Sequence, residues 1–175
     1  MTAHWRSTCA MLEESHLSFR VLPTDLDVNM HLTNSRYFSF MDLSRVDHMI
    51  RNGAWKHIRA RKLMPVLASG SVRFRRPVPP FTRIDVTTRV VGGDEKWVYL
   101  EHKIQAGKTV YAVAILKAAF LDDNGRVPMP LLMEMFGHQG NLPPMTEALI
   151  HIRDADEAVM EIAAPKNTSL THKNG

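Results

Sequence analysis

The run PTDLDVNMHLTNSRY at residues 23–37 is where the chemistry of this chain is concentrated. Six of its side chains can form hydrogen bonds, carry charge or cap a helix: Asp25, Asp27, Asn29, His31, Thr33 and Asn34. They lie directly before a long apolar segment that predicts a helix. A loop that leads into a helix N-terminus stabilises negative charge, because unpaired amide N–H groups and the positive end of the helix dipole both face it.

The alternation of Asp27, Asn29 and His31 goes beyond what a turn or a helix cap requires. Asp, Asn, Ser and Thr are also common in ordinary turns and caps. The alternation, however, offers a carboxylate, an amide and an imidazole, which suit a base or nucleophile, an orienting group and a second titratable group. Residue types alone leave catalysis and structural capping open, and His31 is also compatible with capping of backbone groups.

The same run resembles the hotdog-fold acyl thioesterases. The resemblance is carried by DLDVNMHLTN at residues 25–34, with Tyr37 ten residues after Asp27. It includes the 4-hydroxybenzoyl-CoA thioesterase branch and the plant acyl-ACP thioesterases. The runs VLPTDLD, NSRY and DLSRV are most similar to proteins of the thioesterase-superfamily-member-six type. The resemblance covers about residues 16–125 and implies a sheet curled around a central helix.

The resemblance also implies roles for individual residues. Asp27 matches the catalytic carboxylate of the 4-hydroxybenzoyl-CoA branch. Asn29 and His31 match the Asn-x-His of the plant enzymes, and Asn34 falls where the family's helix-start amide N–H faces the thioester oxygen. The chain departs from both groups: the first commonly has Gly at the position of Met30, and the plant enzymes carry two hotdog units, whereas this chain has room for one.

Composition excludes several classes of protein. The chain has 175 residues, of which 45% are hydrophobic, so we expect one domain with a genuine core. No segment is apolar over the length needed to span a bilayer, and residues 1–6 are not followed by the apolar stretch of a secretory signal, so we expect a cytoplasmic protein. The single Cys9 excludes an internal disulfide and a multi-cysteine metal site.

The charge pattern does not favour nucleic-acid binding. The net charge is +4, from 22 basic and 18 acidic residues spread along the chain. The nine histidines show no tight ligand spacing, so we expect no metal site and no cofactor.

The periodicity of apolar residues predicts an α+β fold with an antiparallel sheet, in the order of a hotdog fold. Pro65 is expected to end the second of two helices. We expect strands over 17–21, 66–76, 83–91, 96–105 and 109–121, and helices over 34–52 and 54–62. In the strand 83–91, the side chains expected to point inward are Ile84, Val86, Thr88 and Val90.

The first helix is expected to be buried on most sides. Thr33 or Asn34 caps its start, and Asn52-Gly53 ends it. Its apolar residues occupy most of its circumference, more than the stripe of a surface helix: Tyr37, Phe38, Phe40, Met41, Leu43, Val46, Met49 and Ile50. Asp42 and Arg45 lie three residues apart on this helix and are expected to form a structural pair.

The resemblance fades beyond the predicted sheet. A short helix is expected over 131–136 and an amphipathic helix over 146–163, which would pack on the sheet or on a partner chain. We therefore expect a single hotdog domain over 1–175, divided into a core of about 16–125, an extension over 126–164 and a polar tail over 165–175.

A thioester is activated enough to be hydrolysed without a metal, by one carboxylate and one set of oxyanion donors. Asp27 would supply the carboxylate and the helix-start N–H near Asn34 the donors, with Asn29 and His31 as orienting groups or proton carriers. The sequence leaves open whether Asp27 attacks the thioester or activates water. The expected product is a free carboxylic acid, released from an acyl-CoA or acyl-ACP.

The acyl tail is expected to lie between the helix and the sheet. Candidates to line it are Tyr37, Phe38 and Met41, although each is equally expected as core. Ser71, Arg73 and Arg75 lie on one side of a strand, where the arginines would meet the phosphates of the carrier. Because exposed arginines on a strand are usually only solvated, this carrier contact is a hypothesis.

Two other functions remain open. Hotdog hydratases and dehydratases resemble Asp-x-Asn-Pro-x-His, with the His five residues after the Asp, whereas here His31 follows Asp27 by four and Pro is absent. A non-catalytic acyl-binding protein with the same fold is the second alternative. The presence of Asp27, Asn29 and His31 together favours the thioesterase.

A single hotdog unit is expected to leave the strand that begins near Val66 at a sheet edge, where unpaired backbone groups favour pairing with another chain. The resemblance implies a homodimer in which two such strands form one continuous sheet. Asp27 of one chain would then face residues 70–75 of the other. A tetramer formed through the acidic helix 146–163 is a further option.

Overall fold

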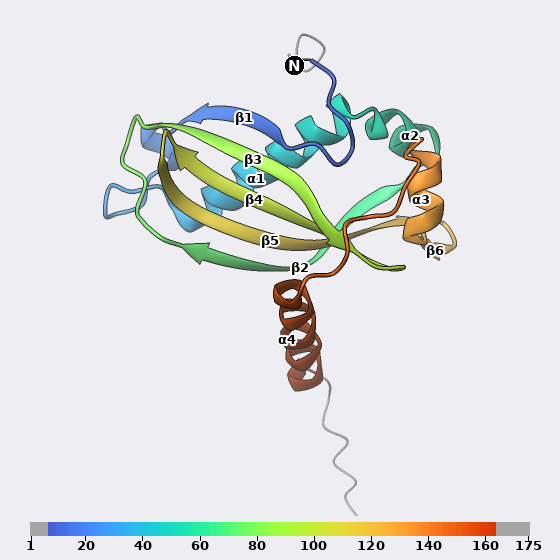
Figure 1. Cartoon of the computed structure of the whole chain (residues 1–175). Coiled ribbons are helices and arrows are strands. Elements are labelled where there is room, and N and C mark those ends of the chain that lie inside the picture. The colour runs from blue at the N-terminus through green and yellow to red at the C-terminus, as the bar shows by residue number, and fades with distance from the viewer. Residues whose placement is uncertain (1–6, 164–175) are drawn as a thin grey trace, which may run out of the picture. The chain divides into compact units, whose positions relative to one another are not determined.

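The computed structural model describes residues 7–163 (Figure 1). The chain divides into two compact units, of which the first ends at Met145 and the second begins at Thr146. The first unit holds a sheet and three helices, and the second holds one helix. The helices are α1 (Asn34–Arg51), α2 (Ala54–Ala60), α3 (Met129–Met135) and α4 (Glu147–Ala163), and a short 3-10 helix, η2, spans Pro23–Asp25.

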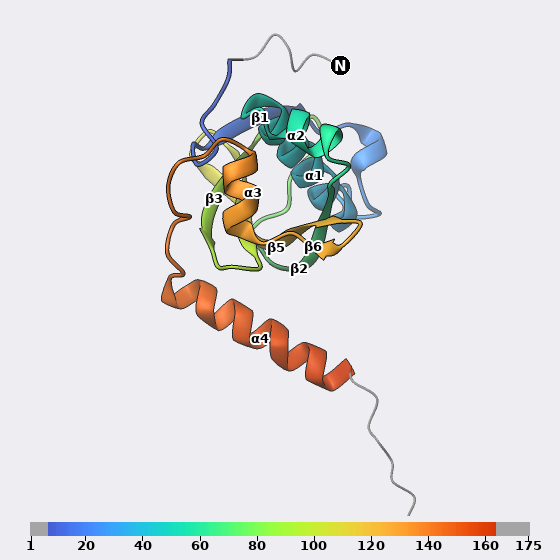
Figure 2. The same ribbon diagram turned by 90° about the vertical axis from the view of Figure 1, so that its right-hand side faces the viewer.

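The sheet of the first unit is antiparallel, with the strand order β1-β3-β4-β5-β2, and β6 pairs with the end of β5. The strands are β1 (Ser15–Arg20), β2 (Met64–Phe74), β3 (Arg83–Gly93), β4 (Val98–Ala106), β5 (Thr109–Asp122) and β6 (Gly125–Arg126). Figure 2 shows the strands curving around α1. This is the predicted α+β arrangement, and β1 and β2 are the edge strands of the order.

Side-chain alternation decides which face of each strand is buried. In β3, Ile84, Val86 and Thr88 have no exposed surface and Val90 is only 7% exposed, so the predicted inward face is confirmed. The prediction that Pro65 ends a helix is wrong, because Pro65 lies inside β2 and pairs with β5. An edge strand tolerates proline, since one side of its backbone has no ladder partner.

Helix α1 ends within one residue of the predicted range and packs an apolar face on the sheet. Tyr37, Phe40 and Met41 are buried in the larger core cluster, together with residues of β3, β4 and β5. The prediction that the helix is buried on most sides is wrong for the single chain, since Phe38 is 39% and Leu43 is 52% exposed. The physical reason is that the sheet covers only one side of the helix (Figure 2).

The start of α1 lies where the sequence predicted it. Thr33 occupies the N-cap position with an extended backbone, but its side chain makes no capping hydrogen bond. Thr33 is thus the N-cap residue through its backbone alone. The N–H of Arg36 instead donates to the O of Thr33 (2.9 Å), which tightens the first turn.

A second core cluster lies where α2 and α3 meet the sheet. Ala54 and Ile58 of α2 are buried in it, as are Met129 and Leu132 of α3 and Phe120 of β5. The short helix predicted over 131–136 is confirmed as α3, with an earlier start. What the sequence did not predict is that α2 and α3, which are far apart along the chain, share one cluster.

The second unit consists of α4 in its described part. The helix predicted over 146–163 is confirmed, and the N–H of Leu149 bonds Oγ1 of Thr146 at its start (3.4 Å). Its packing on the sheet or on a partner stays a prediction, as does the single-domain assignment. The tail predicted over 165–175 lies outside the described residues.

The substitution Leu116→Ala tests the larger core cluster. Leu116 of β5 has no exposed surface and packs in that cluster. Removing the side chain leaves a cavity, so we expect the free energy of unfolding, measured by urea denaturation, to fall by about 2–5 kcal/mol. The matched control Leu131→Ala, at a position that is 44% exposed on α3, should change it by less than about 0.5 kcal/mol. Equal losses in both variants would contradict this assignment of the core.

Candidate active site

The loop between η2 and α1 folds back on itself. The N–H of Asp27 donates to the O of His31 (2.8 Å), and the N–H of Met30 donates to the O of Asp27 (3.0 Å). Leu26 and Leu32 form an antiparallel bridge. Met30 has a φ of 58°, a left-handed conformation that Gly adopts without strain. The Gly that the resemblance implies at this position would therefore fit the same turn.

Asp25 fastens this loop to α1. Its buried carboxylate accepts the N–H of Leu22 (2.9 Å) and pairs with Nε of Arg36 in the first turn of α1 (2.7 Å). Its carbonyl accepts the N–H of Thr33 (2.9 Å). Sequence reasoning missed this role, because an ion pair between residues eleven apart across a loop leaves no periodic signal.

Backbone amides hold the carboxylate of Asp27 in place. Its Oδ1 accepts the N–H of Asn29 (2.8 Å) and the N–H of His31 (3.2 Å). A main-chain bond from His31 lowers the pKa of Asp27, desolvation raises it, and the bond from Asn29 lowers it again, so that the pKa lies below its ordinary value. Asp27 is exposed. It is therefore an ionised carboxylate that solvent and a ligand can reach at neutral pH.

Asn29 and His31 contact Asp27 through their main chains, and their side chains also help to lower its pKa. Asn29 is exposed and His31 is half-buried, and both donate main-chain N–H groups to Asp27. Asn34 is the exposed first residue of α1. Within residues 7–163, the N–H groups of Asn34 and Ser35 have no hydrogen-bond acceptor. Two donors at the positive end of α1 are thus available to an oxyanion.

The three residues predicted to line the acyl tail lie in the larger core cluster or at the surface. Tyr37 and Met41 belong to the cluster, and Phe38 is partly exposed. The ring of Tyr37 meets that of Phe74 edge-on, with 5.0 Å between the ring centroids. Burial is the main cause that raises the pKa of Tyr37. Contact of these residues with an acyl tail stays a prediction.

Several exposed arginines lie on or near residues 75–83, the segment beside the loop that leads into α1. The N–H of Leu32 donates to the O of Val78 (3.0 Å), which places residues 75–83 beside the loop. Ser71 is exposed on β2. The exposed arginines of β2, of this segment and of the facing end of β1 are Arg20, Arg73, Arg75, Arg76 and Arg83. None of them forms an ion pair with another described residue.

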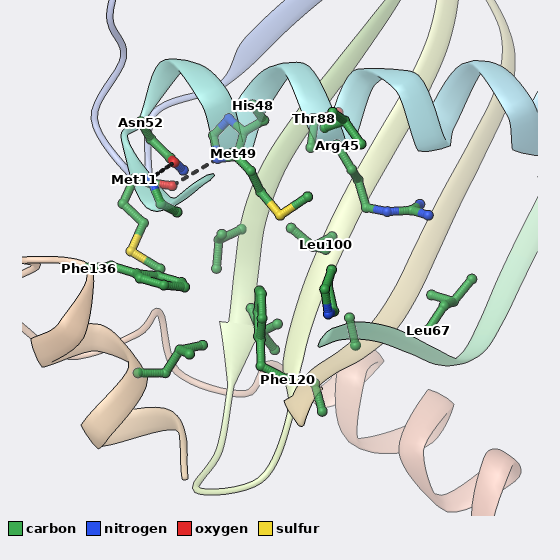
Figure 3. Close-up of a pocket in the computed structure, with 18 of the residues that line it drawn as sticks. Met11, Arg45, His48, Met49, Asn52, Leu67, Thr88, Leu100, Phe120 and Phe136 are labelled. Carbon is green, nitrogen blue, oxygen red and sulfur yellow. Dashed lines mark hydrogen bonds between the residues drawn. The ribbon is translucent and has the colours of Figure 1, made fainter. Parts of the chain in front are cut away.

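A cavity of 280 Å³ lies between the C-terminal half of α1 and the sheet (Figure 3). Most of its lining is apolar, and Ala54, Ala118 and Ala119 leave space because their side chains are short. In Figure 3, Met49 of α1 and Phe136, which follows α3, face the cavity from different sides. The polar residues of the lining are Asp42, Arg45, His48, Asn52 and Thr88.

A chain of hydrogen bonds runs from this cavity into the interior. Nη1 of Arg45 lies 3.4 Å from Nε2 of His102, and Nδ1 of His102 lies 2.9 Å from Oγ1 of Thr88. Oγ1 of Thr88 lies 2.7 Å from Oγ of Ser44, which reaches the O of Val86 (3.4 Å). A guanidinium can only donate, so Nε2 accepts and Nδ1 carries the proton. The chain therefore has one consistent direction, from Arg45 to the backbone of β3.

The remaining polar groups of the lining have protein partners. Nε2 of His48 lies 3.1 Å from the O of Met11, and Oδ1 of Asn52 accepts the N–H of Ala54 (3.0 Å). In the described part of the chain, no three His, Cys, Asp or Glu side chains are grouped as a metal site. None of the helices described there has the length and apolar character to cross a membrane.

Sequence comparison relates this chain to thioesterases. A model of the Thioesterase-like superfamily matches residues 21–150. Protein THEM6 from Xenopus laevis is 27% identical over 165 residues, which are 94% of this chain and 79% of that protein. Protein THEM6 from Danio rerio is 31% identical over 61% of this chain and 52% of its own length. Thioesterase lcsJ from Purpureocillium lilacinum is 33% identical over 48% of this chain, which spans only 33% of that relative.

Solved structures share the fold at lower identity. The YbaW probable thioesterase from Escherichia coli superposes with a TM-score of 0.65 at 21% identity, covering 69% of this chain and 94% of its own. A mutant 4-hydroxybenzoyl CoA thioesterase complexed with 4-hydroxybenzoyl CoA gives a TM-score of 0.62 at 12% identity, covering 70% of this chain and 97% of its own. These likenesses confirm the hotdog fold.

Acid should destabilise the protein through His102. Burial, followed by the charge of Arg45, lowers the pKa of His102 from 6.5 to about 3. Between these values the unfolded chain binds a proton that the folded chain does not, so stability is highest above pH 6.5 and falls as the pH falls toward 3. We expect His102→Gln to remove this contribution to the pH dependence of stability. Urea denaturation at several pH values measures the free energy of unfolding, and the stability advantage of wild type over the variant should shrink as pH falls. Parallel curves would contradict the buried neutral imidazole.

Proposed function

This chain belongs to the thioesterase-like superfamily, and we propose that it hydrolyses acyl thioesters, releasing a free carboxylic acid from an acyl-CoA or an acyl-ACP. The proposal is carried by one observation. The ionised, exposed carboxylate of Asp27 precedes the start of α1, where the N–H groups of Asn34 and Ser35 have no acceptor among the described residues. A carboxylate and oxyanion donors are the two parts that thioester hydrolysis requires.

In the proposed reaction, the thioester carbonyl oxygen accepts hydrogen bonds from the start of α1. These bonds strengthen as the carbonyl carbon becomes tetrahedral and its oxygen gains negative charge. Asp27 either takes a proton from an attacking water or attacks the carbonyl carbon to form an anhydride that water then opens. In both routes the thiolate of the carrier leaves. The low pKa of Asp27 keeps it ionised and ready for either role.

The exposed arginines support an anionic carrier. Arg73, Arg75 and Arg76 lie on or just after β2, and Arg20 pairs in register with Arg83 at the ends of β1 and β3. Guanidinium groups bind phosphate with paired hydrogen bonds. The related structure named above binds a CoA thioester, so CoA is the carrier that we test first.

The cavity supports an acyl group of modest size. Its volume of 280 Å³ lies near the lower end of ligand pockets, which suits a short aliphatic chain or a single ring. Because its lining is mostly apolar, burial of an aliphatic chain or one aromatic ring would be favourable.

We also propose a homodimer that pairs two β2 strands. Phe74, at the end of β2, contacts Tyr37 in the first turns of α1. Antiparallel pairing about the middle of β2 would bring Phe74 of one chain opposite Met64 of the other, next to residues 65–67, which line the cavity. The catalytic loop of one chain would then lie beside the cavity of the other. This geometry favours the beginning of β2, rather than residues 70–75, as the part that faces the loop.

The substitution Asp27→Asn tests the carboxylate. The amide oxygen can still accept the N–H groups of Asn29 and His31, so the loop should keep its shape while hydrolysis of an acyl-CoA panel falls by about three orders of magnitude or more. Asn29→Ala and His31→Ala should be milder, because their backbone N–H groups remain. The thiol released from each acyl-CoA measures the rate.

Asp122→Asn is the matched control for this experiment. Asp122 accepts the N–H of Asn124 (2.8 Å) in the same local geometry, but in the turn between β5 and β6. Its variant should keep wild-type turnover. Near-native turnover in Asp27→Asn would overturn the mechanism. Acyl-CoA binding without turnover in wild type would support the alternative of a non-catalytic acyl-binding protein.

The dimer is tested by a charge on the edge strand. Ser71 is exposed on β2, and pairing about the strand's middle would bring it near Leu67 of the second chain. We expect wild type to be a dimer by light scattering, and Ser71→Glu to shift it toward monomer. His16→Glu places the same charge on β1, the other edge strand, and should leave the dimer intact. A fully active wild-type monomer would contradict the composite site.

A further inference from the structure

One corner of the apolar cavity carries charge. Asp42 and Arg45 both line it, and they form the helical ion pair that the sequence predicted as structural. The two side chains are not equally accessible: Arg45 is 17% exposed and Asp42 is 59% exposed. The guanidinium is therefore the inner member of the pair, and Figure 3 shows it directed along α1 on the side of the cavity where Leu67 lies.

Arg45 has more donors than the structure shows partners for. A guanidinium carries five N–H groups. The described partners are Asp42 and Nε2 of His102, at 3.4 Å, which account for two of them. Removing water from a donor without giving it a new partner is unfavourable. An alkyl chain in this corner would displace water from the remaining N–H groups of Arg45 and offer no acceptor in its place. An occupant with an oxygen at this position would give those N–H groups a new partner.

The corner is also held in a fixed position. His102 has no exposed surface, and its Nδ1 bonds Thr88, which in turn bonds Ser44. This chain of hydrogen bonds anchors the end of the Arg45 side chain to β3 and β4. Fixed donors of this kind select the position of an oxygen as well as its presence.

We propose that this corner binds a hydroxyl group on the acyl chain, so that the preferred substrate of the proposed thioesterase is a hydroxyacyl thioester. That the hydroxylated molecule is a substrate rests on the proposed function, whereas the hydroxyl-binding site is inferred from the cavity alone. The hydroxyl oxygen would accept from Arg45, and its O–H would donate to Asp42. A hydroxyl satisfies both partners at once, whereas an unsubstituted chain satisfies neither.

The charge balance favours a neutral hydroxyl over a second carboxylate. Asp42 already compensates the charge of Arg45. His102 stays neutral because its pKa lies at about 3, so it adds no positive charge to the corner at neutral pH. A carboxylate on the acyl chain would therefore leave an uncompensated negative charge in an apolar cavity, which is costly.

Binding, measured without any turnover, tests the site. Calorimetric titration of the full chain with octanoic acid, and with octanoic acid hydroxylated at its third or its last carbon, compares ligands that differ by one oxygen. We expect one hydroxylated acid to bind about tenfold or more tightly than octanoic acid. The position of the hydroxyl in the tighter-binding acid shows how the acyl chain lies in the cavity. Equal affinity of all three acids would overturn the proposal.

Substitutions assign the preference to Arg45. Arg45→Met should abolish it while keeping or improving the affinity for octanoic acid. Arg51→Met is the matched control, because Arg51 also pairs with an acid of α1, Asp47 (3.7 Å), but does not line the cavity. Arg45→Lys keeps the charge and should retain part of the preference, so it decides the question if Arg45→Met fails to fold. A preference unchanged in both Arg45 variants would overturn the proposal.

Hydrolysis separates this inference from the proposed function. The corresponding octanoyl-CoA and hydroxyoctanoyl-CoA substrates are assayed with the same variants. Selective binding of a hydroxy acid without hydrolysis of any acyl-CoA would support the hydroxyl site and contradict the thioesterase. Hydrolysis without selectivity would support the thioesterase and contradict the hydroxyl site.

Discussion

Every other feature of this protein builds on the packing of α1 into the concave face of the sheet. Tyr37, Phe40 and Met41 bury the first half of the helix. That burial fixes the N-terminus of α1, and with it the donors that an oxyanion would use. The second half lies over a part of the sheet that includes the short side chains of Ala118 and Ala119, and a cavity remains there. One helix thus positions both the candidate reaction centre and the candidate acyl site.

Polar groups within the core fix the orientation of this packing. Burying such groups is unfavourable unless each finds a partner. Asp25 meets this requirement by accepting the N–H of Leu22 and pairing with Arg36, which joins the candidate catalytic loop to the helix. His102 meets it by linking Arg45 to Thr88. Apolar packing alone would permit the helix to slide or turn, whereas these directional bonds hold one arrangement.

The candidate site was partly predictable because part of it is local. The carboxylate of Asp27 and the N–H groups that hold it lie within five consecutive residues, so their spacing in the sequence already limits their distance in space. The side-chain roles predicted for Asn29 and His31 stay predictions. What the sequence did not predict is that both residues also hold Asp27 through backbone N–H groups, because such bonds depend on turn geometry that residue identity does not specify.

Local patterns in the sequence were enough to predict the α+β class, the order of strands and helices along the chain and the position of the candidate catalytic loop, because hydrophobic period and turn residues act over a few neighbouring positions. Tertiary packing was needed to show that Pro65 continues a strand, that α2 and α3 share a core, and that a cavity opens beside Arg45. These features join segments distant along the chain. Their contacts depend on how side chains of different sizes fill one shared volume, and no local pattern records that outcome.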